Sequence, residues 1–211
     1  MTAMEERDRH EARLKSPSAA RNKDPIRDAF LAHMPHDGVM VEIASGSGEH
    51  VVHLAAALPH LRFFPGDIDT AARASIAAWT AHLGLLNVAP PHGADAAAAG
   101  WEEDFPSADG VMAINMIHIA PREAMEGLLA GAGRLLKAGG RLFIYGPFMR
   151  DGAHTAPSNE AFDQSLKARD PRWGVRDLER EVIPLADENG LRRVTVIAMP
   201  ANNFSVVFEK T

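Results

Sequence analysis

The sequence predicts an α/β domain built on a mostly parallel β-sheet with helices on both faces. Three observations support this: apolar runs of strand length alternate with helical periodicity, a glycine-rich turn follows the first run, and four residues join the last two runs. Such alternation implies parallel strands with right-handed crossovers. Four residues are too few for a crossover, so the last two strands should form an antiparallel hairpin.

The first helix is expected to begin at Asp24 and Pro25, since Asp is a favoured N-cap and Pro suits the first helical position. Ile26, Phe30 and Met34 then recur at helical spacing. We next expect a buried strand over residues 39–43, a helix over 49–58, a strand over 61–64 and a helix from Asp69 or Thr70 to Leu83.

The second half of the chain repeats this alternation. Its weakest element is a third strand over residues 88–92, because Pro90 and Pro91 fall inside it and proline donates no hydrogen bond to a sheet. With this strand included, the sheet has seven strands. The remaining expected elements are a strand over 110–115, a helix from Pro121 to about 140, a strand over 141–145, a helix ending near Gly190, and hairpin strands over 193–199 and 204–208.

Length and composition limit the alternatives. The 211 residues suffice for one domain over residues 24–211, preceded by a charged arm or lid over residues 1–23. A net charge of −6 argues against a nucleic-acid partner, and the absence of cysteine excludes thiolate nucleophiles and Cys-ligated zinc. No stretch of ~18 apolar residues or signal-peptide core occurs, so we expect a cytoplasmic protein without a membrane span. The oligomeric state is left open.

The turn after the first strand is a candidate ligand site. Gly46 and Gly48 allow a sharp turn and close approach of the backbone to a ligand, although a plain strand-to-helix turn is the alternative. The third glycine of a dinucleotide fingerprint is replaced by Val51. Glu42, four residues before Gly46, is also unusual for that fingerprint.

Glu42, Gly46 and Gly48 match the first motif of class I S-adenosylmethionine (SAM)-dependent methyltransferases, Glu/Asp-x-Gly-x-Gly-x-Gly, with Ala44 in place of the first glycine. Along nearly its whole length, the chain resembles the methyltransferase-like 26 family. This resemblance implies a Rossmann-like class I methyltransferase fold and SAM as the cofactor; it does not indicate the methyl acceptor. It is carried by residues 16–22, 42–50, 115–121, 145–148 and 199–203.

We expect Glu42, Ala44, Gly46 and Gly48 to bind the cofactor, together with three further residues. Asp67, nineteen residues after Gly48, is a candidate acceptor for both ribose hydroxyls, whereas Asp69 is better explained as a helix cap. Asp95 is a candidate for the adenine amino group, with an exposed loop carboxylate as the alternative. Asn115, after the fourth strand, can hold the methionine end.

Two catalytic candidates follow strands on the same edge. Methyl transfer needs aligned reactants and sometimes a base. His118 suits a base because its unperturbed pKa is ~6.5, and packing under the next helix is the alternative. Tyr145 and Phe148 can wall the acceptor pocket, or can simply belong to the core. His50 and His53 lack an acidic partner at convincing spacing, so we expect no metal and give them surface or cap roles.

Four more residues are acceptor-binding candidates. Arg21 and Asn22 can close over the site as a lid, or can belong to a solvated arm. Asn202 and Asn203 follow the sixth strand and can orient the acceptor, or can merely form the hairpin turn. The long segment 149–174, with a helix over about 159–167, is a further place for specificity.

The function expected from these residues is SAM-dependent methyl transfer to oxygen or nitrogen of a small molecule. The string after the fourth strand is not the Asn/Asp-Pro-Pro-aromatic pattern associated with methylation of exocyclic amines on nucleobases. Together with the acidic charge, this favours a small-molecule acceptor. A non-catalytic SAM-binding scaffold and a nicotinamide-dependent oxidoreductase are the alternatives.

Overall fold

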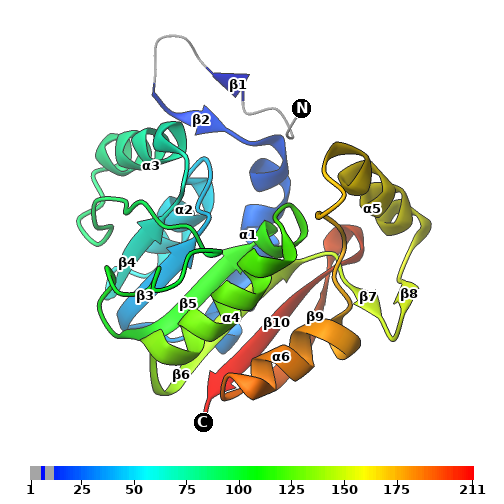
Figure 1. The fold of residues 1–211 in the computed structure, drawn as a ribbon. Helices are drawn as coiled ribbons and strands as arrows, with labels where there is room; N and C mark the ends of the chain where they lie inside the picture. Colours follow the sequence, from blue (N-terminus) through cyan, green and yellow to red (C-terminus); the bar gives the residue numbers. More distant parts are fainter. Residues whose placement is uncertain (1–5, 8–11) are drawn as a thin grey trace.

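A six-stranded sheet forms the centre of the molecule (Figure 1), in a computed structural model that describes residues 6–7 and 12–211. Its strands are β3 (Gly38–Ile43), β4 (Leu61–Gly66), β5 (Ala108–Ile114), β6 (Leu136–Gly146), β9 (Leu191–Met199) and β10 (Asn203–Lys210). They lie in the order β4-β3-β5-β6-β10-β9. The first four are parallel, and β10 is antiparallel to both β6 and β9. The predicted parallel sheet with a closing antiparallel hairpin is confirmed.

Helices cover both faces of the sheet, as predicted (Figure 1). Apolar side chains of α1, α2 and α3 pack in one core cluster, and those of α4 and α6 pack in a second cluster on the other face. Helix α5 belongs to the long segment after β6. The helices are α1 (Pro17–His33), α2 (Glu49–Ala57), α3 (Thr70–Leu83), α4 (Arg122–Leu135), α5 (Pro157–Arg169) and α6 (Ile183–Glu188).

Short elements complete the described chain. Two-stranded pairs form between β1 (Glu6–Arg7) and β2 (Leu14–Lys15) and between β7 (Met149–Arg150) and β8 (Ala153–His154). Short turns of 3₁₀-helix form at η1 (Met116–His118) and η3 (Pro200–Asn202), and a turn of π-helix forms at η2 (Leu178–Val182). None of the described helices is both long and apolar enough to cross a membrane.

The expected seventh strand is reduced to isolated bridges, so the predicted strand count was wrong. Phe63 bridges Val88 and Gly66 bridges His92, both in parallel. Between these bridges lie Pro90 and Pro91, which have no N–H to donate to β4. The segment therefore follows the edge of the sheet without becoming a regular strand.

The first helix begins earlier than predicted. Ser16 is its N-cap and accepts a hydrogen bond from the Ala19 N–H, and Pro17 occupies the first helical position. Pro25, expected at the start, lies inside α1 instead. The helix continues through it despite the lost hydrogen bond, with Phe30 fully buried on its inner side. Arg21 and Asn22 are thus helical residues.

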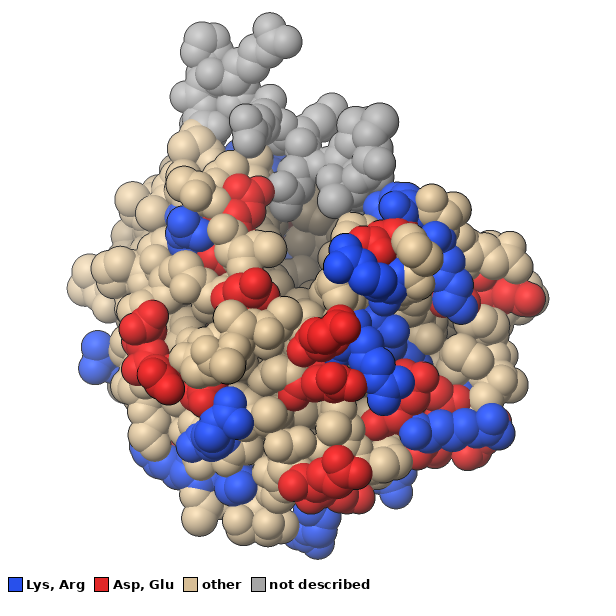
Figure 2. Space-filling model, viewed as in Figure 1, with Lys and Arg blue, Asp and Glu red and all other residues tan. Residues whose placement is uncertain are grey.

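The parallel strands end at one edge of the sheet, and the hairpin turn η3 lies at the same edge because β9 runs in the same direction as β6. The surface is hollowed at this edge (Figure 2). Lys and Arg side chains lie beside Asp and Glu over the face shown, so that face carries no large patch of one sign (Figure 2). Ligand sites of open α/β sheets occur at the carboxyl ends of strands.

Candidate active site

The turn between β3 and α2 adopts the left-handed conformation three times. Ala44, Gly46 and Gly48 have φ values of 58°, 56° and 87°. Ala44 tolerates the conformation that the first glycine of the motif would adopt, at a steric cost that glycine avoids. Gly48 is required for packing as well, because a Cβ there would lie 2.9 Å from the Ile76 Cα. The departure at Ala44 therefore leaves the shape of the turn intact.

Glu42 lies buried at the end of β3, directly before this turn. Its residue exposure is 1%, and its Oε2 has no hydrogen-bond partner within the described residues. Burial raises the pKa of Glu42 to about 8, against a weaker opposing hydrogen bond from Ser45. A buried carboxyl with an unsatisfied oxygen is costly unless a ligand completes it. The residue thus fits a cationic group bound beside the turn.

Asp67 ends the neighbouring strand and faces the turn. Its Oδ2 accepts the Gly46 N–H at 2.9 Å, and its Oδ1 accepts the Asp69 N–H at 2.8 Å. Each carboxylate oxygen has a further lone pair, so the group can still accept from a pair of hydroxyls. Asp69 caps α3 through the Ala71 N–H, which confirms the predicted capping role.

The segment before α1 is tied to the glycine turn. The Ser16 N–H donates to Glu49 Oε2 at 2.6 Å, and the Ser47 hydroxyl donates to the same oxygen at 3.0 Å. Two residues before Ser16, the Leu14 N–H donates to Ser75 Oγ at 2.7 Å, and the Ser75 hydroxyl in turn donates to the Ser47 carbonyl. Residues 14–16 are therefore docked on the turn.

Asn115 and Asp95 lie at the same edge but differ in setting. Asn115 has a left-handed backbone, with φ of 59°, and its N–H donates to the Tyr145 carbonyl at 2.7 Å. Asn115 thus follows β5, and its Oδ1 lies beside Gly146 at the end of β6, 3.5 Å from where a Cβ would be. Asp95 is exposed, and its Oδ1 accepts the Ala97 N–H at 2.9 Å. Asp95 is thus an exposed carboxylate within its loop, and its contact with adenine stays a prediction.

The environment of His118 favours the packing interpretation over a general base. The ring is buried, and its Nδ1 accepts the Arg176 N–H at 3.2 Å. Burial, with a smaller contribution from the Arg176 charge, lowers the pKa of His118 to about 3. A ring with this pKa stays neutral at pH 7 and is a weak base. Its Nε2 lies near Gly146, where a Cβ would come within 2.6 Å.

The two aromatic candidates, Tyr145 near the end of β6 and Phe148 just after it, pack in the core clusters on opposite faces of the sheet. Phe148 is fully buried in the core cluster of α4 and α6 and packs edge-on against His118, with ring centroids 5.0 Å apart. Tyr145 is 3% exposed and belongs to the cluster of α1 and α2. Burial raises the pKa of Tyr145. Tyr145 therefore borders the site, whereas Phe148 supports it from within the core.

The two asparagines of the hairpin turn have separate roles. The Asn203 amide donates to the carbonyls of Pro200 and Ala201 at 3.1 and 3.2 Å, which is the turn-forming alternative. Asn202 is exposed, and its carbonyl accepts from the Asn159 amide of α5 at 2.9 Å. The hairpin turn and α5 are thus joined at the edge of the sheet where the candidate residues gather.

One polar residue of this edge was missed by the sequence analysis. His50, at the second position of α2, places its Nε2 2.9 Å from Asn22 Oδ1. Asn22 thus contacts His50 from α1, while Arg21 beside it is exposed. A signal was present, since His50 follows Gly48 by two residues and must lie beside the turn.

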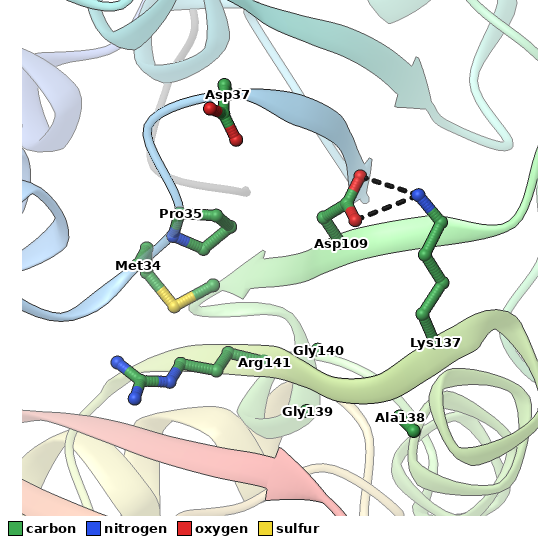
Figure 3. A pocket seen from close by; sticks show the side chains of 9 residues that line it. All are labelled: Met34, Pro35, Asp37, Asp109, Lys137, Ala138, Gly139, Gly140 and Arg141. Atoms are coloured by element: carbon green, nitrogen blue, oxygen red, sulfur yellow. Dashed lines mark hydrogen bonds and ion pairs between the residues drawn. The ribbon is translucent and has the colours of Figure 1, made fainter.

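A cavity of about 390 Å³ lies at the opposite, amino-terminal edge of the strands (Figure 3). Its charged groups are largely engaged: Lys137 Nζ contacts both carboxylate oxygens of Asp109 at 2.8 and 2.9 Å, and Arg141 pairs with Glu209. In Figure 3 the Arg141 side chain points away from that pair. None of the candidate residues lines this cavity, so it is separate from the site. The described residues hold no cluster of metal-ligating side chains.

The sheet order, the closing hairpin and the glycine turn after β3 together define a Rossmann-like methyltransferase fold. The chain superimposes on an O-methyltransferase family protein from Burkholderia thailandensis (TM-score 0.76, 18% identity, 92% of this chain and 57% of that one). It also matches an O-methyltransferase family 2 protein from Planctomyces limnophilus in complex with apigenin (TM-score 0.74, 22% identity, 94% and 64%). A third match is human N-acetylserotonin methyltransferase in complex with SAM, with a TM-score of 0.73 and 14% identity over 92% of this chain and 52% of that one.

The chain spans between about half and two thirds of the length of these proteins. Its own family is defined by sequence: a family model described as "Protein of unknown function (DUF938)" matches residues 13–210. The chain therefore belongs to the DUF938 family.

Proposed function

We propose that this chain is a SAM-dependent methyltransferase that acts on a small molecule. The observation that carries the proposal is the buried Glu42 oxygen without a partner, beside a glycine turn that is hydrogen-bonded to Asp67. A ligand with an ammonium group and a ribose would need two carboxyl groups, which Glu42 at the end of β3 and Asp67 after β4 can provide. SAM carries both. We also propose that the chain is related to the methyltransferase-like 26 family, as its sequence motifs indicate.

In this proposal, residues at the ends of three strands bind different parts of the cofactor. Asp67 would accept the ribose hydroxyls with its free lone pairs, and Glu42 would pair with the ammonium of the methionine end. Asn115 would hold the same end from β5, and Asp95 would contact the adenine edge from its loop. SAM supplies a methyl group bound to a positively charged sulfur, so the chain has mainly to align the acceptor with it.

His118 acts in this proposal as a positioning residue. Its Nδ1 accepts the Arg176 N–H, and the Gly174 N–H donates to its carbonyl at 3.0 Å. The ring thereby fixes the segment after α5 to the end of β5. The net charge of −6 supports a small-molecule acceptor in preference to a nucleic acid.

The test supplies methyl-labelled SAM and a small-molecule fraction of cell extract to the purified protein. We expect label in a product with the wild-type chain and at least tenfold less with Glu42→Gln, because hydrogen bonds to charged groups contribute ~1.5–3 kcal/mol. Binding of SAM without label in any fraction would indicate a scaffold. Affinity for NADH in place of SAM would indicate an oxidoreductase.

A further inference from the structure

Four residues ahead of α1, residues 13–16, lie against α3 and the glycine turn, and we call them the strap. Figure 1 shows β2, which contains Leu14 and Lys15, between α3 and the start of α1. Leu14 is 4% exposed, and the guanidinium carbon of Arg13 lies 4.8 Å from the centroid of the Trp79 ring. The strap is therefore packed against the domain.

One face of α3 holds the backbone of the strap. The Leu14 N–H donates to Ser75 Oγ at 2.7 Å, and the Leu14 carbonyl accepts from the Trp79 Nε1–H at 2.9 Å. Ser75 and Trp79 are four residues apart in α3 and therefore lie on the same face of that helix. Both backbone groups of Leu14 are thus bonded to side chains of a single helix.

Ser75 also connects the strap to the glycine turn. Its hydroxyl accepts the Leu14 N–H and donates to the Ser47 carbonyl at 2.7 Å. A hydroxyl has one proton, so this proton is directed at the turn while a lone pair receives the strap. Ser75 is 0% exposed. Because water cannot easily replace a bond at a buried position, loss of the hydroxyl would leave a donor and an acceptor unsatisfied.

Glu49, the first residue of α2, forms a second link between the same two segments. Its Oε2 accepts the Ser16 N–H at 2.6 Å and the Ser47 hydroxyl at 3.0 Å. Ser47 is therefore held twice, by its carbonyl through Ser75 and by its hydroxyl through Glu49. Each of these links continues to a different residue of the strap, so the strap and Ser47 form a closed ring of hydrogen bonds.

The position of Ser47 between two glycines gives these links their importance. Gly46 and Gly48 have φ values of 56° and 87°. Glycine loses more conformational freedom on ordering than any other residue. A ligand that binds a turn already held in shape avoids part of that entropy loss. The two links therefore supply order that a bound cofactor would otherwise have to impose on the turn.

We propose that docking of the strap and binding of the cofactor are coupled through Ser75 and Glu49, which transmit the position of the strap to the glycine turn. This inference rests on the proposed function, which places the cofactor on that turn. Ser75 and Glu49 act through Ser47, so they are positioning residues. The proposal assigns the lid role expected for residues 1–23 to four of them.

Coupling between two binding events is reciprocal. A variant that loosens the strap weakens cofactor binding, and a bound cofactor reduces opening of the strap by the same factor. A purely structural role would lack the second effect, because a contact that only stabilises the fold does not respond to the cofactor. The strap must therefore be measured with and without ligand.

The first test is calorimetric titration of the full chain with S-adenosylhomocysteine. We expect Ser75→Ala and Glu49→Ala each to weaken binding by about fivefold, the value of one ordinary hydrogen bond. Glu49→Gln should restore the affinity, because one Gln carbonyl oxygen has two lone pairs and can accept both donors. Equal affinity of Ser75→Ala and wild type would overturn the coupling.

The buried leucine of the strap provides a variant with a matched control. Leu14→Ala removes a side chain that is 4% exposed and should also weaken binding of S-adenosylhomocysteine. Leu135→Ala removes a leucine that is 6% exposed, in the core cluster on the other face of the sheet. It should lower stability and leave the affinity unchanged. Equal affinities of these two variants would overturn the coupling, since only one of them alters the strap.

The second test needs no variant and measures amide hydrogen exchange in wild type by NMR. The Leu14 and Ser16 amides should exchange about fivefold more slowly when S-adenosylhomocysteine is bound. The Thr211 amide, which donates to the Gly190 carbonyl at 3.0 Å, is the control and should not change. Binding of S-adenosylhomocysteine without slower exchange in the strap would overturn the coupling and leave the proposed function intact. Absent binding would refute the proposed function, and the coupling with it.

Discussion

Gly46 donates its N–H to the Asp67 carboxylate at 2.9 Å, so the glycine turn after β3 and the acid that ends β4 are linked directly. The contact joins residues that the sequence analysis assigned to one ligand on separate grounds. It also means that the direction of Asp67 is set before any ligand binds. Such preorganisation reduces the entropy lost on binding.

Glu42→Gln is expected to stabilise the protein and to weaken cofactor binding. The folded-state pKa of this acid is raised to about 8, so its contribution to stability falls as pH rises from its unfolded value toward 8. At pH 7 the unfolded state is ionised while the folded state holds the proton, so replacing the ionisable group should raise the free energy of unfolding by up to about 3 kcal/mol. Urea unfolding and calorimetry with SAM measure the two effects. A variant that is less stable and binds SAM normally would contradict this assignment.

The buried His118 and the partly buried His50 are expected to make the protein less stable in acid. The pKa values of His118 and His50 are lowered to about 3 and about 4. Between these values and their unfolded pKa of ~6.5, the unfolded state binds more protons, so stability is lost as pH falls below that point. Glu42 has the opposite slope in part of this range, so the measurement belongs in the Glu42→Gln background.

In that background, unfolding free energies at pH 7 and pH 5 should differ by a few kcal/mol, at ~1.4 kcal/mol per pH unit for each histidine. Adding His118→Asn should remove about half of the difference, since Asn keeps an acceptor for the Arg176 N–H but does not titrate. A pH dependence that is the same with and without His118 would show that its burial does not affect stability.

Gly146→Ala is expected to destabilise the end of β6. A Cβ there would lie 2.6 Å from His118 Nε2 and 2.7 Å from its Cδ2, so the ring must move. Overpacking of this kind costs ~1–3 kcal/mol. Gly93→Ala is a suitable control, because its Cβ would meet nothing closer than 3.8 Å. Thermal unfolding of the two variants compares the effects, and equal melting temperatures would be inconsistent with a close fit between Gly146 and His118.

The order of strands and helices could be predicted because each element leaves a local pattern. The hairpin could be predicted because only four residues connect two apolar runs. The weakness of the strand over 88–92 could be predicted because Pro90 and Pro91 fall inside it. The start of α1 was predicted at the wrong one of two local signals. Ser16 and Pro17 form a cap and first-position proline just as Asp24 and Pro25 do, and the helix begins at the earlier pair and continues through Pro25.

The sequence could predict which candidate residues lie at the ends of strands, as for Glu42, Asp67 and Tyr145. Contacts between distant segments were not. His50 received a surface or cap role because nothing local connects it with Asn22, 28 positions earlier. The role of His118 depends on the Arg176 N–H, 58 positions later, which occupies its Nδ1.

Calorimetric titration with S-adenosylhomocysteine, for wild type, Asp67→Ala and the exposed control Asp104→Ala, tests the central claim most directly. The account predicts one binding site in wild type and in the control. It predicts affinity weakened by about tenfold or more in Asp67→Ala, because charge-assisted hydrogen bonds to the ribose are lost. No heat of binding from wild type at millimolar ligand, or equal affinity in all three proteins, would contradict it.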